Sequence, residues 1–163
     1  MKTLYLMRHA DAARATPPTM SDFDRSLSGR GVIEARVVGR FMRANRMQPD
    51  FIHCSGAART VETAQIVIAA LTGPEGIAHN PDKELYNAPD EKILAAIQAA
   101  DPQHNNLMIV AHNPGVSELL SALGKIDHYC EPGTLGVFRL DSDRWAELDP
   151  KITKLEKIFV PEG

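Results

Sequence analysis

Three short apolar segments of the sequence are each followed closely by side chains that could hold an anionic group. These side chains are Arg8 and His9 after the first segment, Ser55 and Arg59 after the second, and His112 and Asn113 after the third. Two arginines and two histidines that converge would form a pocket suited to a dianionic phosphoryl group, because guanidinium forks match phosphate oxygens bidentately. The sequence therefore predicts phosphate chemistry, provided that the fold brings the three segments together.

The segments that must position these side chains are predicted to alternate between strands and helices. Strands are expected over residues 3–7, 51–54 and 106–111, and helices after Ser28, over 57–71, over 90–100 and from Pro114 to Gly124. Asn113 is expected to cap the last helix, with Pro114 at its first helical position. This alternation predicts an α/β fold, a three-layer α/β/α sandwich around a mostly parallel central sheet. The carboxyl ends of parallel strands meet at one sheet edge, where ligands bind.

The remaining segments are predicted to be surface or edge structure. Residues 11–26 are polar and are predicted to form a surface loop. Short strands are predicted over residues 134–140, 145–148 and about 158–160. In the helix after Ser28, three arginines share the face opposite the apolar one and are expected to be solvated. They are Arg36, Arg40 and Arg43.

Length and composition bound the class of protein. The 163 residues suit one domain, with 44% hydrophobic and 24% charged residues. The formal net charge of -3 argues against a nucleic-acid partner. The two cysteines, Cys54 and Cys130, are too few and too far apart in sequence to indicate a metal site or a set of disulfides. The first apolar run is too short for a signal peptide or a membrane span. We therefore expect a cytoplasmic protein without a membrane partner, and no sequence feature indicates an oligomeric state.

An ordered set of motifs resembles the histidine phosphatases, the superfamily of cofactor-independent acid phosphatases and phosphoglycerate mutases. Within it the chain is most similar to the small SixA-type phosphohistidine phosphatases. The matching pieces are residues 4–10 (LYLMRHA), 24–31 (DRSLSGRG), 55–64 (SGAARTVETA), 84–86 (ELY) and 110–115 (VAHNPG). They follow the family order and span most of the chain, so the resemblance implies one phosphoglycerate mutase-like domain over residues 1–163.

The resemblance also implies roles for individual residues. His9 matches the nucleophile that becomes phosphorylated before water hydrolyses the intermediate. Arg8, Arg59 and His112 match the groups that hold the phosphoryl oxygens. Arg25 matches a further phosphate-facing arginine of the SixA type, and Ser55 would add a donor. Asn113 is expected beside them as a substrate-binding residue; no cofactor or metal is implied.

The proton donor for the leaving group is the weakest part of this match. The mutase-like branch carries a glutamate general acid, and the near match is Glu84, which a solvated glutamate at a loop end would explain equally well. An alkoxide leaving group needs a proton, whereas the imidazole of phosphohistidine leaves far more readily. A weak or absent acid would therefore favour cleavage of a P–N bond.

The expected function is hydrolysis of phosphohistidine on a partner protein through a His9 phosphoenzyme, without a metal ion. Two alternatives remain open: a phosphatase for small metabolite esters, and a phosphoprotein-binding module without turnover. A third, a cysteine phosphatase built on Cys54 and Arg59, is disfavoured because four residues rather than five separate the two. The histidines other than His9 and His112 are not spaced as the ligands of a metal ion would be.

Overall fold

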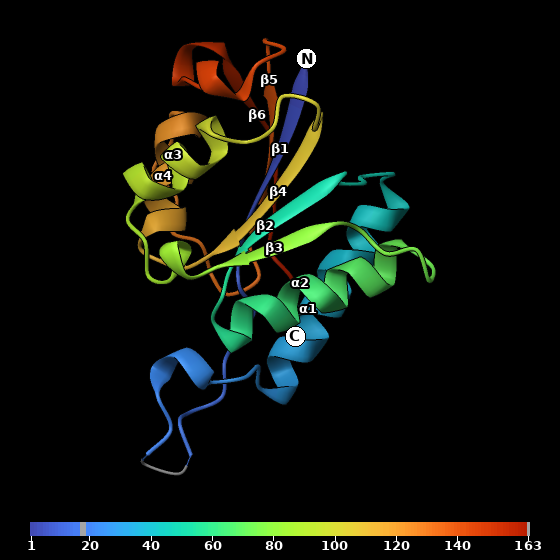
Figure 1. Cartoon of the computed structure of the whole chain (residues 1–163), viewed down its shortest axis with the longest axis vertical. Coiled ribbons are helices and arrows are strands. Elements are labelled where there is room, and N and C mark those ends of the chain that lie inside the picture. The colour runs from blue at the N-terminus through green and yellow to red at the C-terminus, as the bar shows by residue number, and fades with distance from the viewer. Residues whose placement is uncertain (17–18, 163) are drawn as a thin grey trace.

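The computed structural model describes residues 1–16 and 19–162, and in it a six-stranded sheet lies between two pairs of helices (Figure 1). The strands are β1 (Lys2–Arg8), β2 (Phe51–Ser55), β3 (His79–Asp82), β4 (Asn106–Ala111), β5 (Leu135–Leu140) and β6 (Thr153–Phe159). Their order across the sheet is β3-β2-β4-β1-β5-β6. The first four are parallel, while β5 and β6 are antiparallel additions at one edge. The predicted mostly parallel sheet is confirmed.

Two helices cover each face of the sheet (Figure 1). They are α1 (Gly29–Ala44) and α2 (Ala58–Leu71) on one face, and α3 (Asp90–Gln98) and α4 (Gly115–Gly124) on the other. Alternate residues of β1 serve the two cores: Leu6 packs with the α3 and α4 side, and Met7 with the α1 and α2 side. This period of two follows from the pleat of a strand. The three-layer sandwich is therefore confirmed.

The register of the central strands places the predicted site residues next to one another. Arg8 is the Cα partner of Ala111 across the β1–β4 pair. Chain continuation beyond this pair brings His9 and His112 to the same edge of the sheet. Ser55 ends the neighbouring strand β2, and α2 begins three residues later.

Four local predictions differ from the structure. The last strand was expected at about residues 158–160, but β6 begins at Thr153 and ends at Phe159. The strand β3 was not predicted, because its sequence is polar and contains Pro81; it lies at the sheet edge, where a missing N–H donor is tolerated. Residues 145–148 were expected as a strand, but Trp145–Glu147 is a 3₁₀ helix whose indole is buried in the core. Pro114 occupies the N-cap position of α4 rather than its first turn, and its bond to Asn113 is cis.

The predicted loop between β1 and α1 contains a short 3₁₀ helix, η1 (Asp22–Asp24). Two residues of the loop, 17 and 18, lie outside the described part of the chain. Ser28 caps α1 as predicted, since its Oγ accepts a hydrogen bond from the Gly31 amide at 3.0 Å. Within the described ranges, no helix has the length and apolar character needed to cross a bilayer.

Candidate active site

A cavity of about 260 Å³ opens where β1, β2 and β4 end. It is lined by Arg8, His9, Asp11, Ala12, Arg25, Arg59, Asn87, His112, Asn113 and Pro132. Six of the eight predicted site residues are in this lining, from four separate segments of the chain. The geometry thus brings three guanidinium groups and two imidazoles to one small space.

The His9 ring is held with its Nε2 atom free of a proton. Its Nδ1 lies 2.7 Å from the carbonyl oxygen of Ala10. A carbonyl can only accept, so Nδ1 carries the proton, and the Nε2 lone pair accepts a long hydrogen bond from Arg59 Nε at 3.4 Å. The residue as a whole is 8% exposed. Burial, together with the nearby arginines led by Arg59, lowers the pKa of His9 to about 4, so the imidazole is neutral at neutral pH.

His112 faces His9 across the cavity, with 5.1 Å between the ring centroids. Its Nε2 lies 2.7 Å from Ser55 Oγ, and its Nδ1 lies 3.4 Å from Nη2 of Arg59. Because the guanidinium always donates, Nδ1 is the acceptor and Nε2 carries the proton that is donated to Ser55. Burial first, and then the neighbouring His9 and Arg59, lower the pKa of His112 to about 3.

Arg59 lies between the two imidazoles. It is in the first turn of α2, is 5% exposed, and its Nε lies 3.4 Å from Nε2 of His9. The hydroxyl of Thr63 accepts from the Ala10 amide at 3.2 Å and donates to the Arg59 carbonyl at 2.7 Å, which ties the backbone beside His9 to this helix. A guanidinium and an imidazole are therefore fixed relative to each other before any ligand binds.

Arg8 and Arg25 complete the cationic wall of the cavity. Nη1 of Arg8 donates to the Cys130 carbonyl at 3.0 Å, while its Nε is buried and has no hydrogen-bond partner among the described residues. Nε of Arg25 donates to the Ala13 carbonyl at 2.8 Å. A buried N–H without a partner carries a free-energy cost that a bound oxyanion would relieve. Arg8 thus lines the cavity and keeps one N–H donor that the described part of the protein does not use.

One glycine makes the close packing of this edge possible. A Cβ atom added to Gly31 would lie 2.0 Å from the carbonyl oxygen of Asp11. The chain that follows His9 therefore passes directly over the first turn of α1, and Asp11 Oδ2 accepts from Ser28 Oγ at 2.6 Å. A larger residue at position 31 would push the loop, and His9 with it, away from the sheet.

Two predicted site residues lie outside the cavity lining. Ser55 is fully buried and reaches the site through its hydrogen bond with His112. The Glu84 side chain is 77% exposed, and its Oε2 pairs with Nζ of Lys92 at 3.0 Å. Cys54, the residue of the cysteine-phosphatase alternative, is fully buried in the core, and burial raises the pKa of its thiol to about 11. Neither Glu84 nor Cys54 contacts the cavity.

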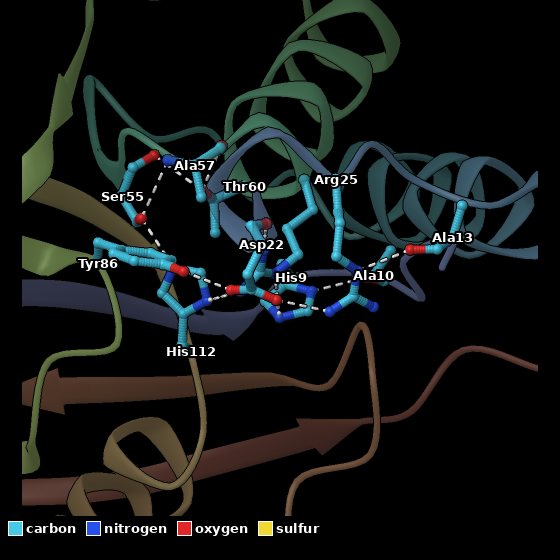
Figure 2. A network of polar contacts seen from close by, with 11 residues as sticks. His9, Ala10, Ala13, Asp22, Arg25, Ser55, Ala57, Thr60, Tyr86 and His112 are labelled. Carbon is cyan, nitrogen blue, oxygen red and sulfur yellow. Dashed lines mark hydrogen bonds and ion pairs between the residues drawn. The ribbon is translucent and has the colours of Figure 1, made fainter. Parts of the chain in front are cut away.

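Two residues that the sequence analysis did not single out join this network (Figure 2). The carboxylate of Asp22, on η1, accepts hydrogen bonds from Arg25, Arg59 and the hydroxyl of Tyr86. The Tyr86 ring also stands edge-on to His112, at 5.5 Å between centroids. The available signals were the placement of Asp22 three residues before Arg25 and of Tyr86 within the motif Glu84-Leu85-Tyr86.

The described ranges contain no group of three or more His, Cys, Asp or Glu residues arranged to hold a metal ion. The donors that converge on the cavity are guanidinium and imidazole nitrogens, and guanidinium groups bind anions rather than cations. Chemically, the arrangement can hold a phosphoryl group against the unprotonated Nε2 of His9.

Comparisons with known proteins agree with this geometry. The family model of the histidine phosphatase superfamily (branch 1) matches residues 4–85. A functionally uncharacterised protein of Mycobacterium tuberculosis is 29% identical, and the match covers 95% of this chain and 99% of that protein. A crystal structure from Agrobacterium tumefaciens, provisionally named phosphohistidine phosphatase SixA, is 30% identical, with a TM-score of 0.83 over 99% of both chains.

A more distant structure shares the fold alone. A mycobacterial glucosyl-3-phosphoglycerate phosphatase, solved with VO3, is 14% identical, with a TM-score of 0.70 over 99% of this chain and 100% of that one. The same architecture therefore occurs in proteins named for P–N and for P–O cleavage. The fold does not by itself select between these substrates.

Proposed function

Because this chain belongs to the histidine phosphatase superfamily, we propose that it removes the phosphoryl group from phosphohistidine on a partner protein. The observation that carries the proposal is the geometry of His9: an unprotonated Nε2 atom, 3.4 Å from Nε of Arg59, in a cavity lined by two further arginines. A neutral nucleophile beside fixed cations is what an in-line attack on a phosphoryl dianion requires.

In the first step, the Nε2 lone pair of His9 attacks phosphorus. The P–N bond of the substrate breaks, and its electron pair goes to the departing imidazole nitrogen. A substrate ring that already carries a proton on its other nitrogen leaves as neutral imidazole, so no proton donor of the enzyme is needed. Arg8, Arg25 and Arg59 offset the charge on the phosphoryl oxygens during the transfer.

In the second step, water attacks the phosphorus of phospho-His9. The N–P bond breaks, its electrons return to Nε2, and inorganic phosphate is released. No step in this sequence calls for a metal ion. Turnover in the presence of EDTA is therefore expected to equal turnover without it.

The position of Glu84 supports phosphohistidine over a phosphate ester as the substrate. An ester releases an alkoxide, which gains much from a carboxylic acid that donates a proton. The Glu84 carboxylate is exposed, pairs with Lys92, and is absent from the cavity lining. A site without this acid suits the better leaving group, the imidazole of phosphohistidine.

The test compares two substrates and isolates the phosphoenzyme. A chemically phosphorylated histidine protein is expected to be hydrolysed with a much higher kcat/KM than β-glycerophosphate. Acid-labile, base-stable ³²P label should appear on the wild-type chain and be absent from His9→Ala, whereas Cys54→Ser should behave as wild type. A preference for β-glycerophosphate would move the assignment to a metabolite phosphatase, and retention of substrate without turnover would indicate a binding module.

A further inference from the structure

The carboxylate of Asp22 occupies the arginines that the phosphoryl group is expected to use. Its Oδ2 accepts from Nη2 of Arg59 at 3.1 Å, and its Oδ1 accepts from Nη1 of Arg25 at 2.7 Å. The Tyr86 hydroxyl donates to the same Oδ2. In Figure 2 the carboxylate lies between His112 and Tyr86 on one side and Arg25 on the other. An anionic group of the chain itself is thus placed within the cationic wall.

The hydrogen-bond capacity of Arg59 is almost fully used by the protein. Its Nε faces His9, Nη1 donates to the Asp22 carbonyl at 2.8 Å, and Nη2 is shared by the Asp22 carboxylate and His112. A guanidinium has five N–H donors in a rigid fork. A phosphoryl group that binds Arg59 end-on, through Nη1 and Nη2, therefore competes with Asp22 for these donors.

Electrostatics points in the same direction. Hydrogen bonds from Tyr86 and Arg25, together with the charge of Arg59, hold the pKa of the Asp22 carboxyl well below its usual range. The group therefore remains ionised at neutral pH and cannot yield its place by taking up a proton. A phosphoryl dianion and a carboxylate that share Arg59 would repel each other, and like charges at short range destabilise a bound state.

The turn that carries Asp22 is able to move without exposing a core. The helix η1 contains no buried residue, and the Asp22 side chain is 46% exposed. Its other contacts are one within the turn, where Ser21 Oγ donates to Asp24 at 2.9 Å, and one with Tyr86, to which Phe23 stands edge-on. Displacement of the carboxylate thus costs its hydrogen bonds to Arg25, Arg59 and Tyr86, and exposes no buried side chain of η1.

We propose that Asp22 is a built-in competitor for the phosphoryl ligand, which occupies Arg25 and Arg59 in the free protein and is displaced when a phosphoryl dianion binds. It thereby determines how tightly the pocket holds anions: weakly bound anions fail to displace it, and product phosphate is released more readily. This inference rests on the proposed function, since it takes the same cavity to be the phosphoryl site.

The test measures the binding of inorganic phosphate to the whole protein by isothermal titration calorimetry. Asp22→Asn keeps the size of the side chain and removes its charge, so its dissociation constant for phosphate is expected to fall about tenfold, the loss of one competing charge-assisted hydrogen bond. Asp24→Asn is the matched control, because it removes the same charge from the same turn at a residue whose side chain pairs with Ser21 instead of the arginines. Its affinity for phosphate is expected to match that of the wild type.

A crystal structure with phosphate gives a second readout that a mere positioning role would not produce. In the phosphate complex of the wild type, the Asp22 carboxylate is expected to have left Arg59. Equal or weaker phosphate binding by Asp22→Asn, or a complex in which Asp22 still contacts Arg59, overturns the inference and leaves the proposed function standing. If neither the wild type nor Asp22→Asn binds phosphate, the phosphoryl site itself is wrong.

Discussion

Two groups of three arginines lie in different surroundings in this molecule. Arg8, Arg25 and Arg59 line the cavity at the sheet edge, whereas Arg36, Arg40 and Arg43 line a hollow of about 400 Å³ between α1 and α2. The second group is exposed and forms no side-chain hydrogen bond or ion pair within the part of the chain that the structure describes. The hollow it lines is larger than the candidate site, at about 400 against 260 Å³.

The difference shows that neither the number of cations nor the size of a hollow identifies a phosphoryl site. Arg59 is 5% exposed and held by His9 and Asp22, so its fork is oriented before a ligand arrives. An exposed arginine must lose side-chain entropy to adopt one geometry, and the surrounding water screens its attraction for an anion. The fixed orientation of Arg59 next to the His9 imidazole is what distinguishes the cavity from the hollow between α1 and α2.

The largest expected effect that tests this comparison comes from deleting one arginine in each place. Arg59→Ala should lower kcat/KM for phosphohistidine protein by about a hundredfold to a thousandfold, because it removes a fixed donor from the transition state. Arg40→Ala, the matched surface control, should stay within about twofold of wild type. Arg59→Lys keeps the charge but loses the fork, and should remain strongly impaired. Equal losses in Arg59→Ala and Arg40→Ala would contradict the comparison.

The sequence alone predicted the parts of the fold that depend on hydrophobic pattern. The apolar runs before Arg8 and His112 became adjacent parallel strands, because each run is buried on both faces. The pattern failed for β3, whose exposed polar residues carry no periodic signal, and for Trp145, whose burial comes from tertiary packing of a 3₁₀ helix. Elements defined by contacts with distant residues leave little trace in local sequence.

The same limit applies to the candidate site. The sequence could place four residues together because each lies at or shortly after the carboxyl end of a strand, and parallel strands bring these ends to one edge of the sheet. They are Arg8, His9, Arg59 and His112. Asp22 could not, since its position depends on the path of the loop after β1. In the segment Glu84-Leu85-Tyr86, the match in sequence pointed to the glutamate, while the structure turns the tyrosine toward Arg59 and His112.

A smaller expected effect concerns the ionisation of His9, which the cavity arginines influence and the helix arginines do not. The pKa of His9 is lowered from 6.5 to about 4 by burial and by Arg59, Arg8 and Arg25. An NMR titration of the free protein should therefore show His9 neutral down to about pH 5. Arg59→Ala should raise this pKa, whereas Arg40→Ala should leave it unchanged. A His9 that titrates near its ordinary value in the wild type would contradict the preorganised site.

The same shift has a consequence for stability. A group whose pKa is lower in the folded than in the unfolded protein contributes stability that is fully present above the unfolded value. For His9 that contribution should be lost progressively as the pH falls from 6.5 toward about 4. Urea unfolding across this range should show the free energy of unfolding decreasing with acidity, with a shallower decrease in Arg59→Ala than in Arg40→Ala.

The smallest expected effect extends the comparison to a carboxylate outside the cavity. Glu84 resembles the helix arginines in being exposed, and its contact is with Lys92, another surface side chain. Glu84→Gln should therefore change kcat/KM for phosphohistidine protein by less than about twofold, as expected for loss of a surface ion pair.

The discriminating measurement repeats the assay with β-glycerophosphate, whose alkoxide leaving group needs a proton. If Glu84 were a general acid that reaches the substrate after binding, Glu84→Gln would lose ester hydrolysis far more than phosphohistidine hydrolysis. An equally small change with both substrates would place Glu84 with the solvated surface, and would leave the cleavage of the P–N bond to His9 and the arginines around it.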